Sequence, residues 1–215
     1  MKTYPLIRAA LLTKDAAVVL ANGSYPTHPL PCSILQESDF VVCCDGAVNA
    51  YLNTGKYPVA VVGDGDSITS ENAALLQAII EPVTEQETND LTKAIHYCTA
   101  HGKKIIYILG ATGKREDHTI ANISLLAEYM PFVEVVMVTD EGVFTPVESA
   151  AIFETYAGQQ ISLFSLDAKP LSVKDLRYPI QDRILTNWWQ ATLNEAIGDS
   201  FTLYTTGKML VYRCF

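Results

Sequence analysis

Cysteine and histidine are scarce in this sequence, and neither is spaced as a metal site requires. The 215 residues include five cysteines and four histidines, and no two cysteines have the C-x-x-C spacing. An odd number of cysteines, with Cys43 and Cys44 adjacent in an apolar run, predicts reduced and buried thiols rather than disulfides or a zinc site. We therefore do not expect a transition-metal centre. Reduced cysteines also lead us to expect a cytoplasmic location.

Basic residues and long apolar runs are also in short supply. The chain has 15 Lys and Arg against 24 Asp and Glu, so 15 − 24 gives a net charge of −9. This balance lacks the basic footprint that nonspecific binding to nucleic acid or anionic lipid needs. Lys14 and Asp15 interrupt the first apolar stretch, and no window reaches the ~18 apolar residues of a membrane span. We expect a soluble protein without nucleic-acid or membrane partners.

The sequence does have enough apolar residues, 49%, for a globular core. Up to about residue 142, short runs dense in Val and Ile alternate with helical stretches. These runs do not alternate with polar residues, which is typical of parallel strands covered on both faces. Residues 1–142 are therefore predicted to form an α/β domain with an open, mostly parallel sheet flanked by helices. The expected strands are Ala16–Leu20, Phe40–Cys44, Val59–Val62, Lys104–Leu109 and Val133–Val138, and the expected helices span residues 70–80, 90–100 and 117–129.

Residues 143–215 have a different texture. Short segments that are β-branched or aromatic are separated by Gly, Pro or Asp, which predicts an all-β sandwich domain. Between the last two segments, Thr206-Gly207 predicts a hairpin turn. The chain is thus expected to consist of an α/β domain in residues 1–142 and a β-sandwich domain in residues 143–215.

Carboxylates, glycines and basic residues follow three of the predicted strands. Asp45 follows one strand, Gly63–Ser67 follows the next, and Gly110–Arg115 follows a third. In open α/β sheets, ligands bind beyond the carboxyl ends of the strands. We expect these loops to meet at one edge of the sheet.

Asp64 and Asp66 stand two residues apart on a glycine-flanked turn. Carboxylates this close repel unless a cation or a proton relieves them, and oxygen ligands favour Mg²⁺. The alternative is a plain turn in which Asp or Ser caps the next helix. With Asp45 and Asp90 expected nearby, we predict Mg²⁺ bound by Asp64, Asp66 and Asp90.

The loop Gly110–Arg115 offers backbone N–H groups to a phosphate, and Lys114 and Arg115 add positive charge. It lacks the spacing of a P-loop, so a strand-to-helix turn with a solvated basic pair is the alternative. Likewise, Asp117 either binds substrate or caps the following helix, and His118 either binds substrate or is an ordinary first-turn residue.

Two other segments also allow two interpretations. The segment before the helix at residues 90–100 is the first of them. In one interpretation Thr88 or Asn89 only caps the helix. In the other, Asp90 adds a carboxylate that binds metal or acts as a base, and Gln86 hydrogen-bonds substrate. The adjacent Trp188 and Trp189 belong to the core or an interface, or one of them stacks on a flat ring.

Five motifs, in order, resemble those of the thiamine pyrophosphokinase family. They are L-A-N-G-S (20–24), C-D-G-A-x-N (44–49), V-G-D-G-D-S-I (62–68), E-Q-E-T-N-D-L-T-K (85–93) and G-A-T-G-K-R-E-D-H-T-x-A-N (110–122), with a weaker match at L-N-E (193–195). The resemblance implies an α/β catalytic domain, a β-sandwich, and a homodimer that binds thiamine between its subunits. It also implies transfer of the pyrophosphoryl group of ATP to the hydroxyl of thiamine with Mg²⁺, giving thiamine diphosphate and AMP.

The resemblance also implies roles for individual positions. Asp64 and Asp66 match the metal-binding aspartates of the family, and Asp90 and Asp45 match two further acidic positions. We predict that all four are catalytic and that Asp90 or Asp45 accepts the hydroxyl proton. The candidate ATP- and substrate-binding residues are Asn22, Asn49, Ser67, Gln86, Lys93, Arg115, Asp117, His118, Trp188, Trp189 and Asn194.

One departure from the family pattern keeps alternatives open. Leu193 stands where the family has a serine that lines the thiamine site. A pyrophosphokinase for another hydroxymethyl heterocycle, such as a pterin, would keep the same fold and metal. A non-catalytic thiamine or nucleotide sensor is a third hypothesis, although every acidic position of the motifs is filled.

Overall fold

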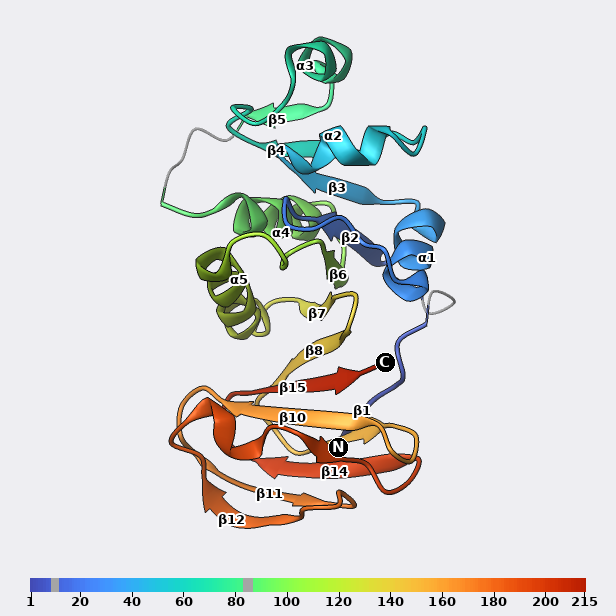
Figure 1. The fold of residues 1–215 in the computed structure, drawn as a ribbon. Helices are drawn as coiled ribbons and strands as arrows, with labels where there is room; N and C mark the ends of the chain where they lie inside the picture. The colour runs from blue at the N-terminus through green and yellow to red at the C-terminus, as the bar shows by residue number, and fades with distance from the viewer. Residues whose placement is uncertain (9–11, 83–86) are drawn as a thin grey trace. The chain divides into compact units, whose positions relative to one another are not determined.

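The computed structural model describes residues 1–8, 12–82 and 87–215, and the chain divides into two compact units (Figure 1). The α/β unit comprises Ala9–Leu125 and Phe132–Asp140. The β unit comprises Met1–Arg8, Leu126–Pro131 and Glu141–Phe215.

The α/β unit contains a run of parallel strands in the order β7-β6-β2-β3-β4-β5. Every residue of β2, β3 and β4 is buried, as expected for strands covered on both faces. The strands are β2 (Ala16–Leu20), β3 (Val41–Cys44), β4 (Ala60–Gly63), β5 (Ile80–Pro82), β6 (Ile105–Leu109) and β7 (Glu134–Val138).

The helices of this unit lie on both sides of its sheet, with α4 and α5 to the left and α1 to the right in Figure 1. They are α1 (Pro29–Glu37), α2 (Ala47–Leu52), α3 (Ser70–Leu76), α4 (Asp90–Ala100) and α5 (Glu116–Tyr129), of which the last residues, from Leu126 on, belong to the β unit. The α4 helix contacts β2, β3 and β4. Asn89 caps α4 by accepting a hydrogen bond from the Thr92 N–H at 2.9 Å. Within the described ranges, no helix is both long and apolar enough to cross a membrane.

The order of the strands creates a switch point beside β2. From β2 the chain adds β3, β4 and β5 to one side and then places β6 and β7 on the other. Ligands bind at such reversals, beyond the carboxyl ends of the strands. The loops that follow β2 and β6 therefore border the expected site.

Asp140, which follows β7, holds the segment that leads into α1. Its carboxylate accepts hydrogen bonds from the backbone N–H groups of Thr27 at 3.0 Å and His28 at 3.1 Å. Burial raises the pKa of the Asp140 carboxyl, but the hydrogen bonds from Thr27 and His28 outweigh burial, and the net shift is downward.

We expect Asp140→Asn to lower the free energy of unfolding at neutral pH by about 1–3 kcal/mol, because charge-assisted hydrogen bonds are lost. A carboxyl with a depressed folded-state pKa stabilises fully above its unfolded pKa, about 3.9, and this contribution disappears as the pH falls through the folded value. Urea unfolding of both proteins should therefore show the difference shrinking below about pH 4. A difference independent of pH would contradict this role of the charge.

The β unit is a sandwich of two antiparallel-rich layers. One layer has the order β1-β9-β14-β11-β12, and in the other β13, β10, β15 and β8 pair in sequence. The strands are β1 (Lys2–Tyr4), β8 (Gly142–Val147), β9 (Ala151–Glu154), β10 (Gln160–Ser165), β11 (Pro170–Lys174), β12 (Ile180–Ile184), β13 (Asn194–Glu195), β14 (Ser200–Thr205) and β15 (Met209–Cys214).

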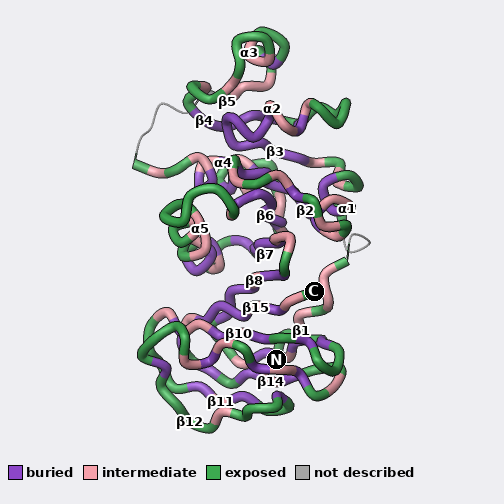
Figure 2. Tube along the Cα trace, in the orientation of Figure 1, coloured by how far each residue is buried: buried purple, intermediate pink, exposed green. Residues whose placement is uncertain are grey.

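Both layers supply the core of the sandwich, and the buried residues follow the strands in Figure 2. Burial alternates along β10 and β14, as expected for strands with one covered face. Phe153 stacks on Tyr4 and on Phe201, with ring centroids 4.9 and 5.0 Å apart. The predicted fold class, an open mostly parallel α/β sheet followed by an all-β sandwich, is confirmed. The domain division at residue 142 stays a prediction, and β1 pairs with β9 so that the first residues belong to the β unit.

The predicted hairpin at Thr206-Gly207 is wrong. β14 pairs with β9 and β11, whereas β15 pairs with β10 and β8, so this turn crosses from one layer to the other. Gly207 packs against Asp167 and Lys169, which a Cβ atom would meet within 3.0 Å. The glycine is thus needed for a close crossover rather than for a hairpin.

Candidate active site

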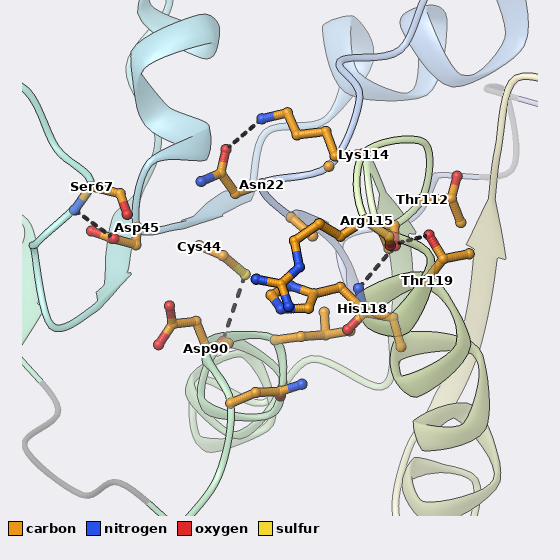
Figure 3. Close-up of a pocket in the computed structure, with 16 residues that line it drawn as sticks. Asn22, Cys44, Asp45, Ser67, Asp90, Thr112, Lys114, Arg115, His118 and Thr119 are labelled. Atoms are coloured by element: carbon orange, nitrogen blue, oxygen red, sulfur yellow. Dashed lines mark hydrogen bonds between the residues drawn. The ribbon is translucent and has the colours of Figure 1, made fainter.

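A cavity of about 410 Å³ lies in the α/β unit beyond the carboxyl ends of its strands (Figure 3). The end of β3 and the loops after β2, β3, β4 and β6 line it, together with the first turn of α4 and the first two turns of α5. Six of the predicted site residues are among the lining: Asn22, Asp45, Ser67, Asp90, Arg115 and His118. The structure therefore brings together acidic and basic positions that are far apart in the sequence.

Backbone hydrogen bonds join the loops after β2 and β6. The Gly23 N–H donates to the Gly110 carbonyl at 2.6 Å, and the Ser24 N–H donates to the Thr112 carbonyl at 2.8 Å. A Cβ atom on Gly23 would meet both carbonyl oxygens within 3.0 Å. The glycine-bearing loop is thus fixed through its carbonyls, and the close approach requires glycine at position 23.

Asp45 forms the acidic corner of the cavity. It is 4% exposed and has a positive φ of 26°, a conformation that is strained for any residue but glycine. Its Oδ2 accepts a hydrogen bond from the Ser67 N–H at 2.9 Å, whereas its Oδ1 is buried without a partner among the described residues. A buried carboxylate oxygen without a partner is costly, so this atom is suited to a bound cation or proton donor.

Asp90 is the first residue of α4, and its carboxyl lies 3.5 Å from the Lys93 ammonium. Burial raises the pKa of the Asp90 carboxyl, Lys93 lowers it, and the negative charges of Asp45 and Asp64 raise it again, so the net shift is upward. The Cys44 thiol donates a hydrogen bond to the Asp90 carbonyl at 3.6 Å, which ties α4 to β3. Because Asp45 directly follows Cys44, this bond holds Asp90 near the Asp45 carboxylate.

The basic side of the cavity comes from the end of the β6 loop and the first turn of α5. The Lys114 ammonium donates to the Asn22 side chain at 3.1 Å. Arg115 is hydrogen-bonded to Asp117, and this contact lowers the pKa of the Asp117 carboxyl to about 2. Asp117 thus orients Arg115 and does not itself line the cavity.

Some predicted site residues do not line the cavity, and two of these have structural hydrogen bonds instead. The Asn49 side chain donates to the Ser67 carbonyl at 2.9 Å and accepts from the Asn72 amide at 2.8 Å, so it fixes the loop that carries Ser67. Asp64 accepts a hydrogen bond from the Asp66 N–H at 3.2 Å within their own turn. Gln86 lies outside the described residues.

The predicted metal ligands Asp64, Asp66 and Asp90 are not assembled as a cluster. In residues 1–8, 12–82 and 87–215, no three His, Cys, Asp or Glu side chains are grouped closely enough to hold a metal ion. Of the three, only Asp90 lines the cavity. This ligand set stays a prediction.

The remaining predicted residues belong to the β unit. Trp188 packs edge-on against Phe164, with centroids 5.9 Å apart, and Trp189 is 70% exposed. Asn194 is buried, accepts from the Tyr178 N–H at 3.1 Å and donates to the Tyr178 carbonyl at 2.8 Å. Its amide therefore has a structural role in this chain.

The cavity also contains residues that the sequence prediction omitted. Thr119 and Asn122 lie on α5 and follow Arg115, the residue before the helix, at helical spacing, so they continue the face that Arg115 begins. The Asn122 side chain donates to the Ala111 carbonyl at 2.9 Å and supports the β6 loop. Extending the helical periodicity from Arg115 would have found both.

The fold defines the class of protein: an α/β unit with a cavity at the switch point of its sheet, joined to a β-sandwich unit. A family model described as "Thiamin pyrophosphokinase, catalytic domain" matches residues 32–137, and one described as "Thiamin pyrophosphokinase, substrate-binding domain" matches residues 142–212. The chain belongs to the thiamin pyrophosphokinase family.

Individual relatives support this placement. A thiamine pyrophosphokinase from Bacillus subtilis is 29% identical over 112 residues, which are 50% of this chain and 52% of the relative. Thiamin pyrophosphokinase 1 from Caenorhabditis elegans is 26% identical over 117 residues, 50% of this chain and 48% of the relative. The matched segments span about half the length of these relatives.

Solved structures share the fold over nearly the whole chain. The crystal structure of thiamine pyrophosphokinase from Bacillus subtilis has a TM-score of 0.79 and 21% identity, with 93% of this chain and 98% of that one covered. The yeast thiamin pyrophosphokinase structure has a TM-score of 0.80 and 16% identity, with 100% and 91% covered. At these identities the likeness concerns the fold.

Proposed function

We propose that this protein transfers the pyrophosphoryl group of ATP to the hydroxyl of thiamine, giving thiamine diphosphate and AMP. The observation that carries the proposal is the cavity at the switch point. Asp45 and Asp90 form its acidic side, and Lys114, Arg115 and His118 line its basic side. A polyphosphate needs cationic groups around it, and an attacking hydroxyl needs a carboxylate to accept its proton.

Mg²⁺ fits the residues present. Asp45 has a buried carboxylate oxygen without a partner in the described chain, and Asp90 lines the same cavity. Proteins commonly hold Mg²⁺ through one or two carboxylates, and substrate phosphates complete the coordination, so a cluster of three is not required. Asp64 and Asp66 remain proposed ligands beside Asp90. When bound, Mg²⁺ would neutralise charge on the polyphosphate.

The chain's own residues position the substrates and move the proton. The joined loops after β2 and β6 hold Asn22, Lys114 and Arg115 in fixed places for the phosphates. Arg115, oriented by Asp117, stabilises charge that develops as the bond to AMP breaks. Asp90 is proposed as the acceptor of the hydroxyl proton, since its carboxylate lines the cavity at the start of α4, across from the basic groups that would hold the phosphates.

The roles of the β unit and the assembly are part of the same proposal. We propose that thiamine is held with help from Trp188 or Trp189, between subunits of a homodimer, in the cytoplasm and without nucleic-acid or membrane partners. The exposed Trp189 ring suits stacking on a flat heterocycle. The family resemblance supports the homodimer and the cytoplasmic location, and the acidic composition supports the absence of nucleic-acid and membrane partners.

The test is release of AMP, measured with thiamine and with a pterin alcohol as acceptors. We expect AMP to form with thiamine, to stop when Mg²⁺ is chelated, and to return when Mg²⁺ is restored. If AMP formed faster with the pterin alcohol than with thiamine, the acceptor would be a pterin and the assignment of thiamine would be wrong. Thiamine binding without AMP release would indicate a sensor and overturn the proposal.

A further inference from the structure

A second cavity, of about 180 Å³, lies within the β unit. Most of its lining is apolar, but it includes two polar side chains that are almost completely buried, Arg213 at 2% and Gln159 at 4% exposed. Its lining residues are Leu6, Ile7, Arg8, Val143, Tyr156, Gln159, Arg213 and Phe215. Buried polar groups normally have hydrogen-bond partners, so this pair requires an explanation.

Arg213, on β15, is a buried cation with incomplete hydrogen bonding. One terminal nitrogen donates to the Glu154 carbonyl at 2.8 Å and to the Tyr4 carbonyl at 3.3 Å, and the guanidinium lies over the Phe153 ring. Its Nε is buried and has no partner among the described residues. Burial lowers the pKa of Arg213 to about 10 and Glu154 raises it, so the group is positively charged at neutral pH.

Gln159 supplies a buried hydrogen-bond acceptor, whereas Arg213 supplies a buried donor. Its Nε2 donates to the Cys214 carbonyl at 2.6 Å, and this bond fixes the amide orientation because a carbonyl oxygen can only accept. Its Oε1 is left as a buried acceptor without a partner in the described chain. The cavity therefore combines a charged donor at Arg213 with a neutral acceptor at Gln159.

We infer that this cavity binds a small oxyanion that keeps a proton, such as hydrogen phosphate. An oxyanion oxygen would accept from the Arg213 Nε–H, and the protonated oxygen would donate to the Gln159 Oε1. Arg8 at the exposed rim adds a second positive charge. The nearby acidic group, Glu154, accepts a hydrogen bond from the Leu6 N–H at 3.2 Å with its Oε2.

The chemistry of the pair predicts selectivity between two ions of similar shape. Inorganic phosphate carries at least one proton at neutral pH, whereas sulfate carries none and offers Gln159 no donor. Both ions attract Arg213 and Arg8 through charge. Phosphate should therefore bind more tightly than sulfate, and Gln159 should account for the difference.

Titration of the full chain with inorganic phosphate or sodium sulfate, followed by NMR, tests this inference. We expect saturable phosphate-dependent shifts of the Arg213 Nε–H and the Gln159 side-chain amide, with weaker binding of sulfate. Gln159→Leu should weaken phosphate binding roughly tenfold and abolish the preference over sulfate, since one hydrogen bond to a charged ligand is lost. Arg8→Ala, at the exposed rim, should weaken both ions, and Arg183→Ala, an exposed arginine of β12, should change neither.

Three results would overturn the inference. Shifts confined to Gly110–Arg115 would place phosphate only in the cavity of the α/β unit. Equal phosphate affinity in folded Gln159→Leu and wild-type protein would exclude the proposed hydrogen bond. Absence of saturable shifts at Arg213 would mean that the cavity does not take this anion.

Discussion

Asp90→Asn is expected to lower kcat for AMP formation by at least about a hundredfold, the range for removal of a general base. The substitution keeps the size of the side chain and its place at the start of α4 but removes the charge. It also removes the carboxylate partner of Lys93. Steady-state kinetics with saturating ATP and thiamine measures this change.

Asp15→Asn is the matched control for this variant. Asp15 is an exposed aspartate that lies 3.7 Å from Lys104, outside the cavity lining. Exposed ion pairs contribute only about 0–1 kcal/mol to stability, so kcat should stay close to wild type. If Asp90→Asn retained more than about a tenth of the wild-type kcat, the role of general base that we give to Asp90 would be wrong.

Gly23→Ala is expected to disrupt the phosphate side of the cavity. The new Cβ would press on the carbonyl oxygens of Gly110 and Thr112, and neither is the end of a flexible side chain. The hydrogen bonds between the two loops would lengthen, and overpacking of this kind costs about 1–3 kcal/mol of stability. We expect a lower Tm and at least about tenfold weaker ATP binding by calorimetry, a loss of about 1.4 kcal/mol.

Gly198→Ala is the control for this second variant. A Cβ at Gly198 would have nothing within 4 Å, so both Tm and ATP affinity should remain near wild type. Equal behaviour of Gly23→Ala and Gly198→Ala would show that the close approach of the two loops is unimportant for ATP binding.

Burial on both faces is why the parallel strands were predictable. β2 occupies its predicted range, and its Val and Leu residues are buried whichever face they point to. By contrast, β12 is exposed along almost its whole length, so it has no hydrophobic pattern to detect. The α1 helix was not predicted from the sequence. Its first turn contains Pro29 and Pro31, and prolines suit the first turn of a helix but are also common in loops.

The site was predictable only in outline. Asp45 and Arg115 were expected at one edge because the carboxyl ends of parallel strands meet there, and both line the cavity. The sequence did not show which side chains point inward. Asn49 is engaged by contacts with the distant residues Ser67 and Asn72, and Asp64 by a local hydrogen bond within its own turn. The unpartnered Arg213 Nε and Gln159 Oε1 atoms could not be predicted, because their burial depends on contacts between segments that are distant in the sequence.

Identification of the phosphorus products distinguishes pyrophosphoryl transfer from transfer of a single phosphoryl group. With ATP, thiamine and Mg²⁺, phosphorus NMR should show thiamine diphosphate and AMP appearing together in equal amounts. Thiamine monophosphate formed together with ADP would mean transfer of a single phosphoryl group, and it would contradict the proposed attack on the β-phosphorus of ATP.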